Sequence, residues 1–255
     1  MMSYWILALA LPLLLQAAPS YVRLLPQDCH EIYRSGENRS GVYTIYPEEE
    51  APVQVYCDMG CKEDSFRGWT VFQRRMDGSV NFYRPWEQYK NGFGNKSGEY
   101  WMGLDSLYSM TKNKRYELRV DLEGFDGAKV YAEYTYFSIG DEDTSYTLQV
   151  GGFMDGGAGD SLYYHNGARF STFDRENSYY HYYYDYYYYY YNYYYSCARE
   201  SLGAFWYFGC HLTNPNGIYM WTVDWNNYGK AVSWYSWRGL EYNLKSITMK
   251  IRPAP

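Results

Sequence analysis

Short runs of alternating hydrophobic and polar residues dominate the first 150 positions of the chain. Such period-two runs are typical of strands that bury one face. The clearest is 116–122, where Leu118, Val120 and Leu122 share a face. A turn at 124–127 and a second run at 129–137 predict a hairpin. Further strands are predicted at 42–46, 53–56, 69–74, 146–150 and 247–251.

Helical patterns are few and short. Only residues 100–110 and parts of 87–91 have helical character. From Gly151 onward, Gly, Asn, Asp and aromatic residues replace the regular alternation. Backbone N–H and C=O groups in such a region lack the hydrogen-bond partners that neighbouring strands provide, so other interactions must hold the chain in place. A Cys197–Cys210 disulfide is one candidate. Irregular segments of this kind are also common places for binding sites.

The amino-terminal residues have the pattern of a secretory signal. Residues 6–15 form a short apolar run, and small residues at 17–20 are suited to cleavage. We predict a signal peptide at 1–18 and a short lead-in at 19–26. An uncleaved anchor is the alternative, but the run is too short for a comfortable bilayer crossing. The protein is therefore expected to be secreted, to the extracellular space or matrix, with no membrane span.

Composition narrows the class of partner. The chain has 255 residues, and its net charge of −6 argues against nucleic acid. Tyrosine occurs 36 times, and many of these residues fall in a low-complexity insertion at 179–195. A uniform run specifies no strand register, so we expect this tract to be exposed and poorly ordered. A simple expansion and a cross-linkable patch of phenols are both open interpretations.

Five cysteines fit an exported protein, in which disulfides persist: Cys29, Cys57, Cys61, Cys197 and Cys210. The odd number leaves at least one thiol free or paired with another chain. Cys57 and Cys61 do not form a CxxC pair, and no second Cys/His pair has zinc-ligand spacing. Asn38 and Asn95 begin Asn-x-Ser triplets and are candidate glycosylation sites.

Catalytic signatures are missing from the sequence. It has four histidines and contains no HExxH, GxSxG, P-loop or dinucleotide-binding motif. A dispersed catalytic site leaves no such signature, but the pattern favours a protein that is not an enzyme.

Several ordered blocks resemble the fibrinogen-related domain family. They begin with Asp-Cys-His-Glu-Ile at 28–32 and Val-Tyr-Cys-Asp-Met at 55–59. The central blocks are Gly-Trp-Thr-Val-Phe-Gln-Arg-Arg at 68–75 and Gly-Glu-Tyr-Trp-Met-Gly-Leu at 98–104. Later come Asp-Gly-Gly-Ala-Gly-Asp-Ser-Leu at 155–162 and Cys-His-Leu-Thr-Asn-Pro-Asn-Gly at 210–217. The resemblance covers residues 27–253, apart from the tyrosine-rich tract.

This resemblance implies an α+β fold in three parts. They are a small amino-terminal disulfide subdomain, a central twisted antiparallel sheet with short helices, and an irregular carboxy-terminal subdomain that binds ligand and calcium. By position, the implied disulfides are Cys29–Cys57 and Cys197–Cys210. Cys61 is then left over, and it could link the subunits of a homo-oligomer, which the family commonly forms.

The family also implies a calcium site after the Phe-Asp step at 173–174. Its candidate ligands are Asp174, Glu176, Ser178 and the carbonyl of Tyr180, and alternate spacing would let oxygens converge on one hard cation. Glu replaces the usual Asp at 176, and Ser brings no charge at 178. We expect a weakened site, with a solvated polar turn as the alternative.

A pocket for acetylated groups is the other family feature. Cys210 and His211 correspond to part of its wall, with a cis peptide implied at 209–210, and Tyr228 and Trp237 are candidate aromatic walls. A core position is an equal alternative for Trp237. Ser201 stands where the family commonly has a tyrosine, so one wall is missing or replaced.

These observations predict a recognition glycoprotein of the extracellular matrix or innate immunity. It would bind acetylated glycans or matrix fibres, with calcium as the expected cofactor. The alternative is an adhesive matrix protein that uses the tyrosine-rich tract and lacks a working pocket. Binding that survives deletion of 179–195 would exclude the tract as the active part.

Overall fold

The computed structural model describes residues 25–48, 51–60, 67–178, 196–221 and 227–255. Several predictions fall outside these ranges. They are the signal peptide at 1–18, most of the lead-in at 19–26, Cys61, Tyr180 and the tyrosine-rich insertion at 179–195.

One antiparallel sheet organises the described residues. Its main path runs β1-β2-β3-β9-β6-β7-β8, and two short strands branch from β3. The last strand of the chain lies between β3 and β6 and so joins both halves of the sequence in one sheet. The strands are β1 (Gly41–Glu48), β2 (Ala51–Asp58), β3 (Trp69–Arg75), β4 (Phe93–Gly94), β5 (Tyr100–Trp101), β6 (Tyr116–Glu123), β7 (Lys129–Ile139), β8 (Leu148–Gly156) and β9 (Ser246–Pro253).

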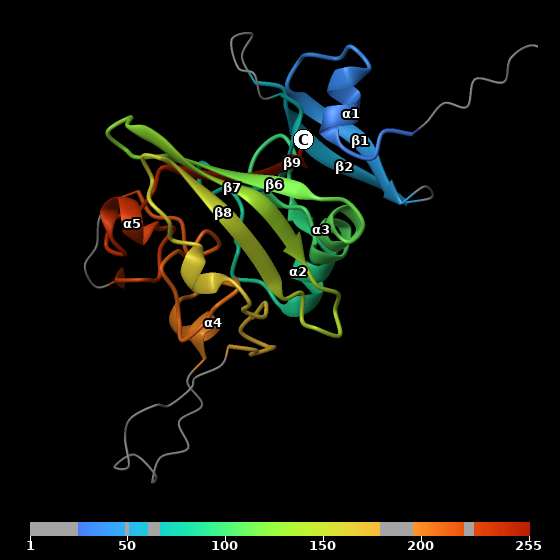
Figure 1. Cartoon of the computed structure of the whole chain (residues 1–255). Coiled ribbons are helices and arrows are strands. Elements are labelled where there is room, and N and C mark those ends of the chain that lie inside the picture. Colours follow the sequence, from blue (N-terminus) through green and yellow to red (C-terminus); the bar gives the residue numbers. More distant parts are fainter. Residues whose placement is uncertain (1–24, 49–50, 61–66, 179–195, 222–226) are drawn as a thin grey trace, which may run out of the picture.

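Short helices surround this sheet. They are α1 (Cys29–Arg34), α2 (Trp86–Asn91), α3 (Leu104–Thr111), the 3-10 turn η1 (Tyr163–His165), α4 (Cys197–Glu200) and α5 (Tyr235–Arg238). Figure 1 shows α1 beside β1 and β2 at one end of the molecule, whereas α4 and α5 lie at the other end. The expected α+β fold, with an irregular carboxy-terminal part, is therefore confirmed.

An aromatic core joins the sheet to the irregular part. Phe72 of β3 stacks on Phe137 of β7 with ring centroids 5.5 Å apart. Phe170 lies 5.7 Å from Trp101 and 5.2 Å from Trp206, and all five side chains are buried. Ring burial of this size is a main source of stability, so the irregular region shares the core of the sheet.

Two local predictions were wrong, and one helix was missed. The helix expected at 100–110 begins only at Leu104, because Gly103 has a φ of 112° and cannot be helical. The strand expected at 146–150 starts at Leu148 and continues to Gly156, since Tyr146 lies in a turn with φ 51°. Helix α1 was not predicted, although Asp28 caps it by accepting a hydrogen bond from the Glu31 amide.

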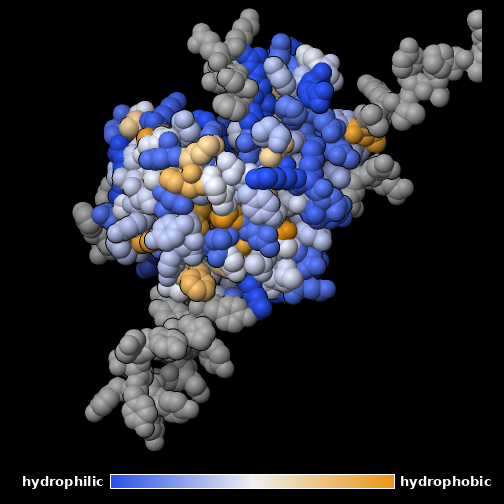
Figure 2. Space-filling model, in the orientation of Figure 1, coloured by the Kyte–Doolittle hydropathy of each residue, from blue (hydrophilic) through white to orange (hydrophobic). Residues whose placement is uncertain are grey.

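The face of the molecule drawn in Figure 2 is mainly hydrophilic. On the face drawn in Figure 2, hydrophobic colour forms patches surrounded by hydrophilic residues. Among the described residues, no helix has the length and apolar character needed to cross a bilayer.

Candidate functional site

Two disulfides fasten the chain where the family resemblance implied them. Cys29 and Cys57 are bridged with Cα atoms 5.4 Å apart, and Cys197 and Cys210 with Cα atoms 5.2 Å apart. The second bridge joins the start of α4 to the turn that carries His211. It holds this turn in a region that has few strand contacts.

The turn at 208–210 differs from the prediction. The described residues contain no cis peptide, so the expected cis bond at 209–210 is wrong. The chain reverses instead through left-handed conformations, with φ 55° at Gly209 and 83° at Cys210. The Phe208 amide donates to the Cys210 carbonyl at 2.9 Å, which closes the turn. A non-glycine residue at positive φ is uncommon and is often found at functional sites.

The imidazole of His211 packs 5.7 Å from the ring of Tyr207, and its other side faces Gly229. Burial lowers the pKa of His211 to about 4, although a hydrogen bond to the Gly229 backbone partly opposes this. The ring is therefore neutral at physiological pH. Its Nδ1 atom is buried and has no hydrogen-bond partner among the described residues.

His165 supports the same turn from the inside of the protein. Its Nε2 accepts a hydrogen bond from the Leu212 amide at 3.1 Å. Its Nδ1 therefore carries the proton and donates to the Trp206 carbonyl at 2.6 Å. Burial lowers the pKa of this imidazole to about 3. One neutral side chain thus ties residue 206 to residue 212.

In the irregular part, the side chains of two buried asparagines bond backbone groups that neighbouring strands would pair in a sheet. Asn214 donates to the carbonyls of Ser201 and Gly229, at 2.8 and 3.2 Å, and accepts from the Tyr207 hydroxyl. Asn216 donates to the Ala204 carbonyl at 2.9 Å. These amides satisfy backbone groups that would otherwise be buried without partners. Asn214 also holds Gly229 close to the segment that follows His211.

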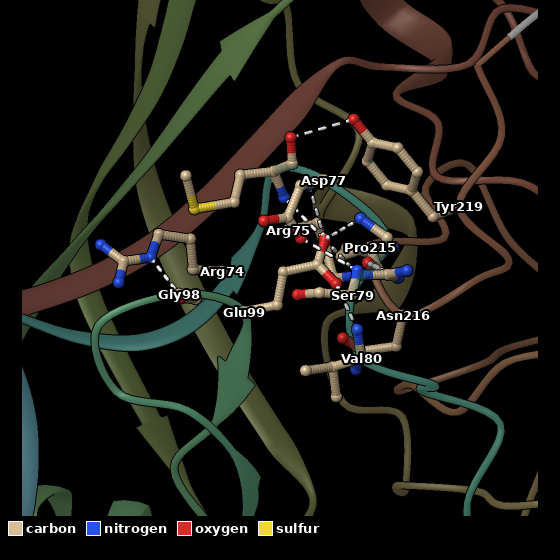
Figure 3. Close-up of polar contacts among 12 residues, drawn as sticks. Arg74, Arg75, Asp77, Ser79, Val80, Gly98, Glu99, Pro215, Asn216 and Tyr219 are labelled. Carbon is tan, nitrogen blue, oxygen red and sulfur yellow. Dashed lines mark hydrogen bonds and ion pairs between the residues drawn. The ribbon is translucent and has the colours of Figure 1, made fainter.

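A buried ion pair anchors this network to the sheet (Figure 3). Glu99 accepts hydrogen bonds from the amides of Met76, Asp77, Gly78 and Val80, at 2.8 to 3.1 Å. Its Oε1 lies 3.7 Å from Nε of Arg75.

Arg75 in turn connects Glu99 to the irregular part. Its guanidinium donates to the carbonyls of Pro215 and Gly217. Burial lowers the pKa of Arg75 to about 10, against the attraction of Glu99, so it stays charged. The 76–80 loop and the 215–217 segment are therefore held by one pair.

The two predicted aromatic walls lie in different surroundings. Tyr228 is 57% exposed and directly precedes Gly229. Trp237 contacts Tyr242 and Arg238, and Arg238 pairs with Asp126 of the β6–β7 turn. Trp234 is the buried core residue of this stretch. Tyr235, which the sequence reasoning missed, donates its amide to the Leu212 carbonyl and is exposed.

The predicted calcium ligands divide into two groups. Glu176 accepts hydrogen bonds from the amide and hydroxyl of Ser178 and from the hydroxyl of Ser196. Asp174 is directed elsewhere, because it accepts from the Trp86 amide at 2.9 Å and from the Thr172 hydroxyl. Within the described ranges, no group of three acidic, His or Cys residues could hold a metal ion. Glu176 and Ser178 alone supply fewer oxygens than the six to eight calcium prefers, so calcium binding stays a prediction.

Both glycosylation candidates are exposed. Asn38 follows α1, and Asn95 lies in the turn between β4 and β5, where its side chain accepts from the Ser97 amide. Their modification also stays a prediction.

The sequence reasoning missed His165, Asn214, Asn216 and Glu99 as organisers of this region. The Asn-Pro-Asn-Gly run at 214–217 is the only local signal, because such residues mark turns. The partners of these side chains lie far away in the sequence, and no spacing rule predicts them.

Removing the Cys197–Cys210 bridge has a measurable expected cost. The cysteines are separated by 13 positions, and the loss of such a bridge lowers the free energy of unfolding by about 3 kcal/mol. Urea unfolding of a Cys197→Ser/Cys210→Ser variant checks this value. A change below about 1 kcal/mol would mean that the turn is held without the bridge.

Residues 25–254 match the family described as fibrinogen beta and gamma chains, C-terminal globular domain. The chain is 43% identical to microfibril-associated glycoprotein 4 of Bos taurus, covering 98% of this chain and 99% of that protein. It is 45% identical to the Homo sapiens protein of that name, over 90% of this chain and 86% of the relative.

Solved structures agree with this match. The fibrinogen-like globe domain of human ANGPTL2 is 39% identical, with a TM-score of 0.81, covering 90% of this chain and all of that one (100%). Lamprey fibrin D-dimer, complexed with the peptide Gly-His-Arg-Pro-amide, is 31% identical with a TM-score of 0.77, covering 90% of this chain and 74% of that one. By sequence match and fold, the chain belongs to the fibrinogen C-terminal globular domain family.

Proposed function

We propose that this protein is a secreted recognition glycoprotein of the extracellular matrix that binds N-acetylated glycans at the His211 turn. Relatives named microfibril-associated glycoprotein 4 support the matrix setting, and their similarity extends over most of the chain. No step of catalysis is part of the proposal.

The observation that carries this proposal is the unpartnered Nδ1 of His211. Gly229 donates its own amide to the Leu240 carbonyl, so only its carbonyl is left to accept from the His211 ring. Because Nδ1 makes no hydrogen bond among the described residues, Nε2 is the ring nitrogen that donates to Gly229 and carries the proton. Nδ1 is then a buried acceptor without a donor in the described part of the chain. Buried polar atoms normally have partners, and the N–H of an acetamido group supplies one.

This arrangement favours N-acetyl over O-acetyl groups. An acetamido group offers a donor to Nδ1, whereas an acetate ester offers none. An unpaired buried acceptor costs about 1–3 kcal/mol, so N-acetylglucosamine should compete about tenfold better than 6-O-acetylglucose. Retention on an acetylated resin, eluted with each sugar, measures this ratio.

Calcium dependence is tested with the same resin. We expect retention to fall when a chelator removes calcium, because Glu176 and Ser178 lie on the segment leading to α4, which the Cys197–Cys210 bridge joins to the His211 turn. If neither the chelator nor competing N-acetylglucosamine reduces retention, the lectin function is contradicted. If N-acetylglucosamine reduces retention but the chelator does not, only the calcium site is contradicted.

His211→Phe is the direct test of the proposed acceptor. This variant keeps an aromatic ring against Tyr207 but removes Nδ1, and we expect at least a tenfold loss of affinity for N-acetylglucosamine. His30→Phe, in α1, is the matched control and should bind normally.

The pH dependence gives an independent readout. Because the pKa of His211 is lowered to about 4, binding should stay constant between pH 7.5 and 5.5 and weaken as pH falls through about 4. A midpoint near 6.5 would show an ordinary exposed histidine and would contradict the buried acceptor.

A further inference from the structure

Three aromatic side chains, two exposed and one half-buried, form a cluster beside the His211 turn. Tyr163 is 62% exposed and Phe208 is 45% exposed, and Tyr164 lies between them. The ring centroids of Tyr163 and Tyr164 are 6.4 Å apart, and those of Tyr164 and Phe208 are 5.9 Å apart. We call these three residues the aromatic platform. Large apolar side chains exposed together are unusual on a soluble protein and often mark a binding surface.

The platform is held in place by the fold. Oδ1 of Asp160 accepts from the Leu162 and Tyr163 amides, both at 3.0 Å, and from the Tyr134 hydroxyl at 2.6 Å. On the other side, the backbone of Phe208 is fixed by the hydrogen bond that its amide donates to the Cys210 carbonyl. A ligand would therefore meet rings that are already ordered, which lowers the entropic cost of binding.

The platform is continuous with the proposed N-acetyl site. A Cβ placed on Gly209 would lie 3.3 Å from the Tyr164 hydroxyl, so Tyr164 borders the turn that carries His211. Leu212, the residue after His211, donates its amide to His165 in η1. A glycan that places one sugar at His211 can therefore extend over these rings.

The chemistry of the platform suits a neutral ligand. The rings of the platform contact one another, and Tyr164 also contacts the neutral imidazole of His165. Two of its three rings carry a hydroxyl, so it combines apolar ring faces with hydrogen-bonding tips. A pyranose has the complementary surface, because its C–H groups pack on the negative face of an aromatic ring and its hydroxyls stay in water.

We infer that Tyr163, Tyr164 and Phe208 form a stacking subsite for the neutral sugar rings that extend from the sugar bound at His211. This inference rests on the proposed function, because it places the first sugar at that turn.

The test compares N-acetylglucosamine with its β1,4-linked trisaccharide by calorimetry, using the full chain. The wild-type protein should bind the trisaccharide about tenfold more tightly than the monosaccharide. Phe208→Ser and Tyr163→Ser should each lower trisaccharide affinity about five- to tenfold, and Tyr163→Ser, which lies outside the His211 turn, should leave monosaccharide affinity unchanged. Phe125→Ser is the matched control, because Phe125 is 42% exposed at the β6–β7 turn. It should change neither value.

Cellotriose separates this inference from the proposed function, because it has sugar rings but no N-acetyl group. If N-acetylglucosamine does not bind but cellotriose binds in a Phe208-dependent manner, the His211 site fails and the platform stands. If the monosaccharide binds and the trisaccharide gains nothing, or its gain survives Phe208→Ser, the platform is overturned. Binding of none of these sugars overturns both. The sugar assignment would be overturned if the protein did not bind the trisaccharide but instead bound an oligoproline peptide, or self-associated, in a Phe208-dependent manner.

Discussion

Glu99→Ala is expected to lower the free energy of unfolding by at least about 4 kcal/mol, or to prevent folding. The Glu99 carboxylate accepts from four backbone amides of residues 76–80 and faces Arg75, and both side chains are buried. Truncation would leave these donors without an acceptor and a buried guanidinium without its counter-charge. Either defect is among the costliest single changes in a protein.

Two control variants make this prediction specific. Glu99→Gln keeps the shape and one acceptor oxygen, so it should retain part of the stability and separate the charge from the hydrogen bonds. Glu87→Ala removes an exposed glutamate of α2 and should change stability by no more than about 0.5 kcal/mol. Urea unfolding followed by tryptophan fluorescence measures all three variants. A loss below about 1 kcal/mol for Glu99→Ala would show that water replaces the carboxylate.

The protein should also lose stability in mild acid because of His165. The folded-state pKa of this imidazole is lowered to about 3 from an ordinary value of 6.5. Between these two values the unfolded chain binds a proton that the folded protein does not, so the free energy of unfolding falls as pH decreases. Above pH 6.5, His165 should not contribute to any change of the free energy of unfolding with pH. A tenfold change in proton affinity corresponds to about 1.4 kcal/mol, so His165 accounts for about 4–5 kcal/mol across the window.

His165→Gln isolates this contribution from that of the carboxylates. Its amide can still donate to the Trp206 carbonyl or accept from the Leu212 amide, but it does not titrate. The fall in stability between pH 6.5 and pH 3 should therefore be smaller in the variant than in the wild type. His30→Gln is the control and should keep the wild-type slope. Equal slopes for all three proteins would exclude His165 as the acid-sensitive group.

The sequence predicted the sheet well because alternation is a local signal. Leu118, Val120 and Leu122 lie on the buried face of β6, as their spacing required, and the turn at 124–127 joins β6 to β7. The positions of β4 and β5 were not predictable in this way, since each is a two-residue pairing that depends on β3. The helix at 100–110 was misplaced because the conformation of Gly103 outweighs the periodicity around it.

The candidate site was predicted less completely than the sheet. The motif placed His211 beside Cys210, and its Nδ1 is buried without a hydrogen-bond partner among the described residues. Trp237 was chosen as a candidate aromatic wall from a later loop by the family resemblance, and its ring contacts are with Tyr242 and Arg238. Long-range hydrogen bonds such as those of Asn214 decide these placements, and sequence periodicity contains no information about them.

The bond between Glu176 and the Ser196 hydroxyl has a consequence for engineering. Ser178 and Ser196 flank residues 179–195 in the sequence, and Glu176 braces them by accepting hydrogen bonds from the Ser178 amide and the Ser196 hydroxyl. The entropy of closing a loop rises only slowly with its length, so a change in the number of residues between these two braced positions should cost little stability. This junction is therefore a natural place to splice in a reporter peptide without remodelling the scaffold.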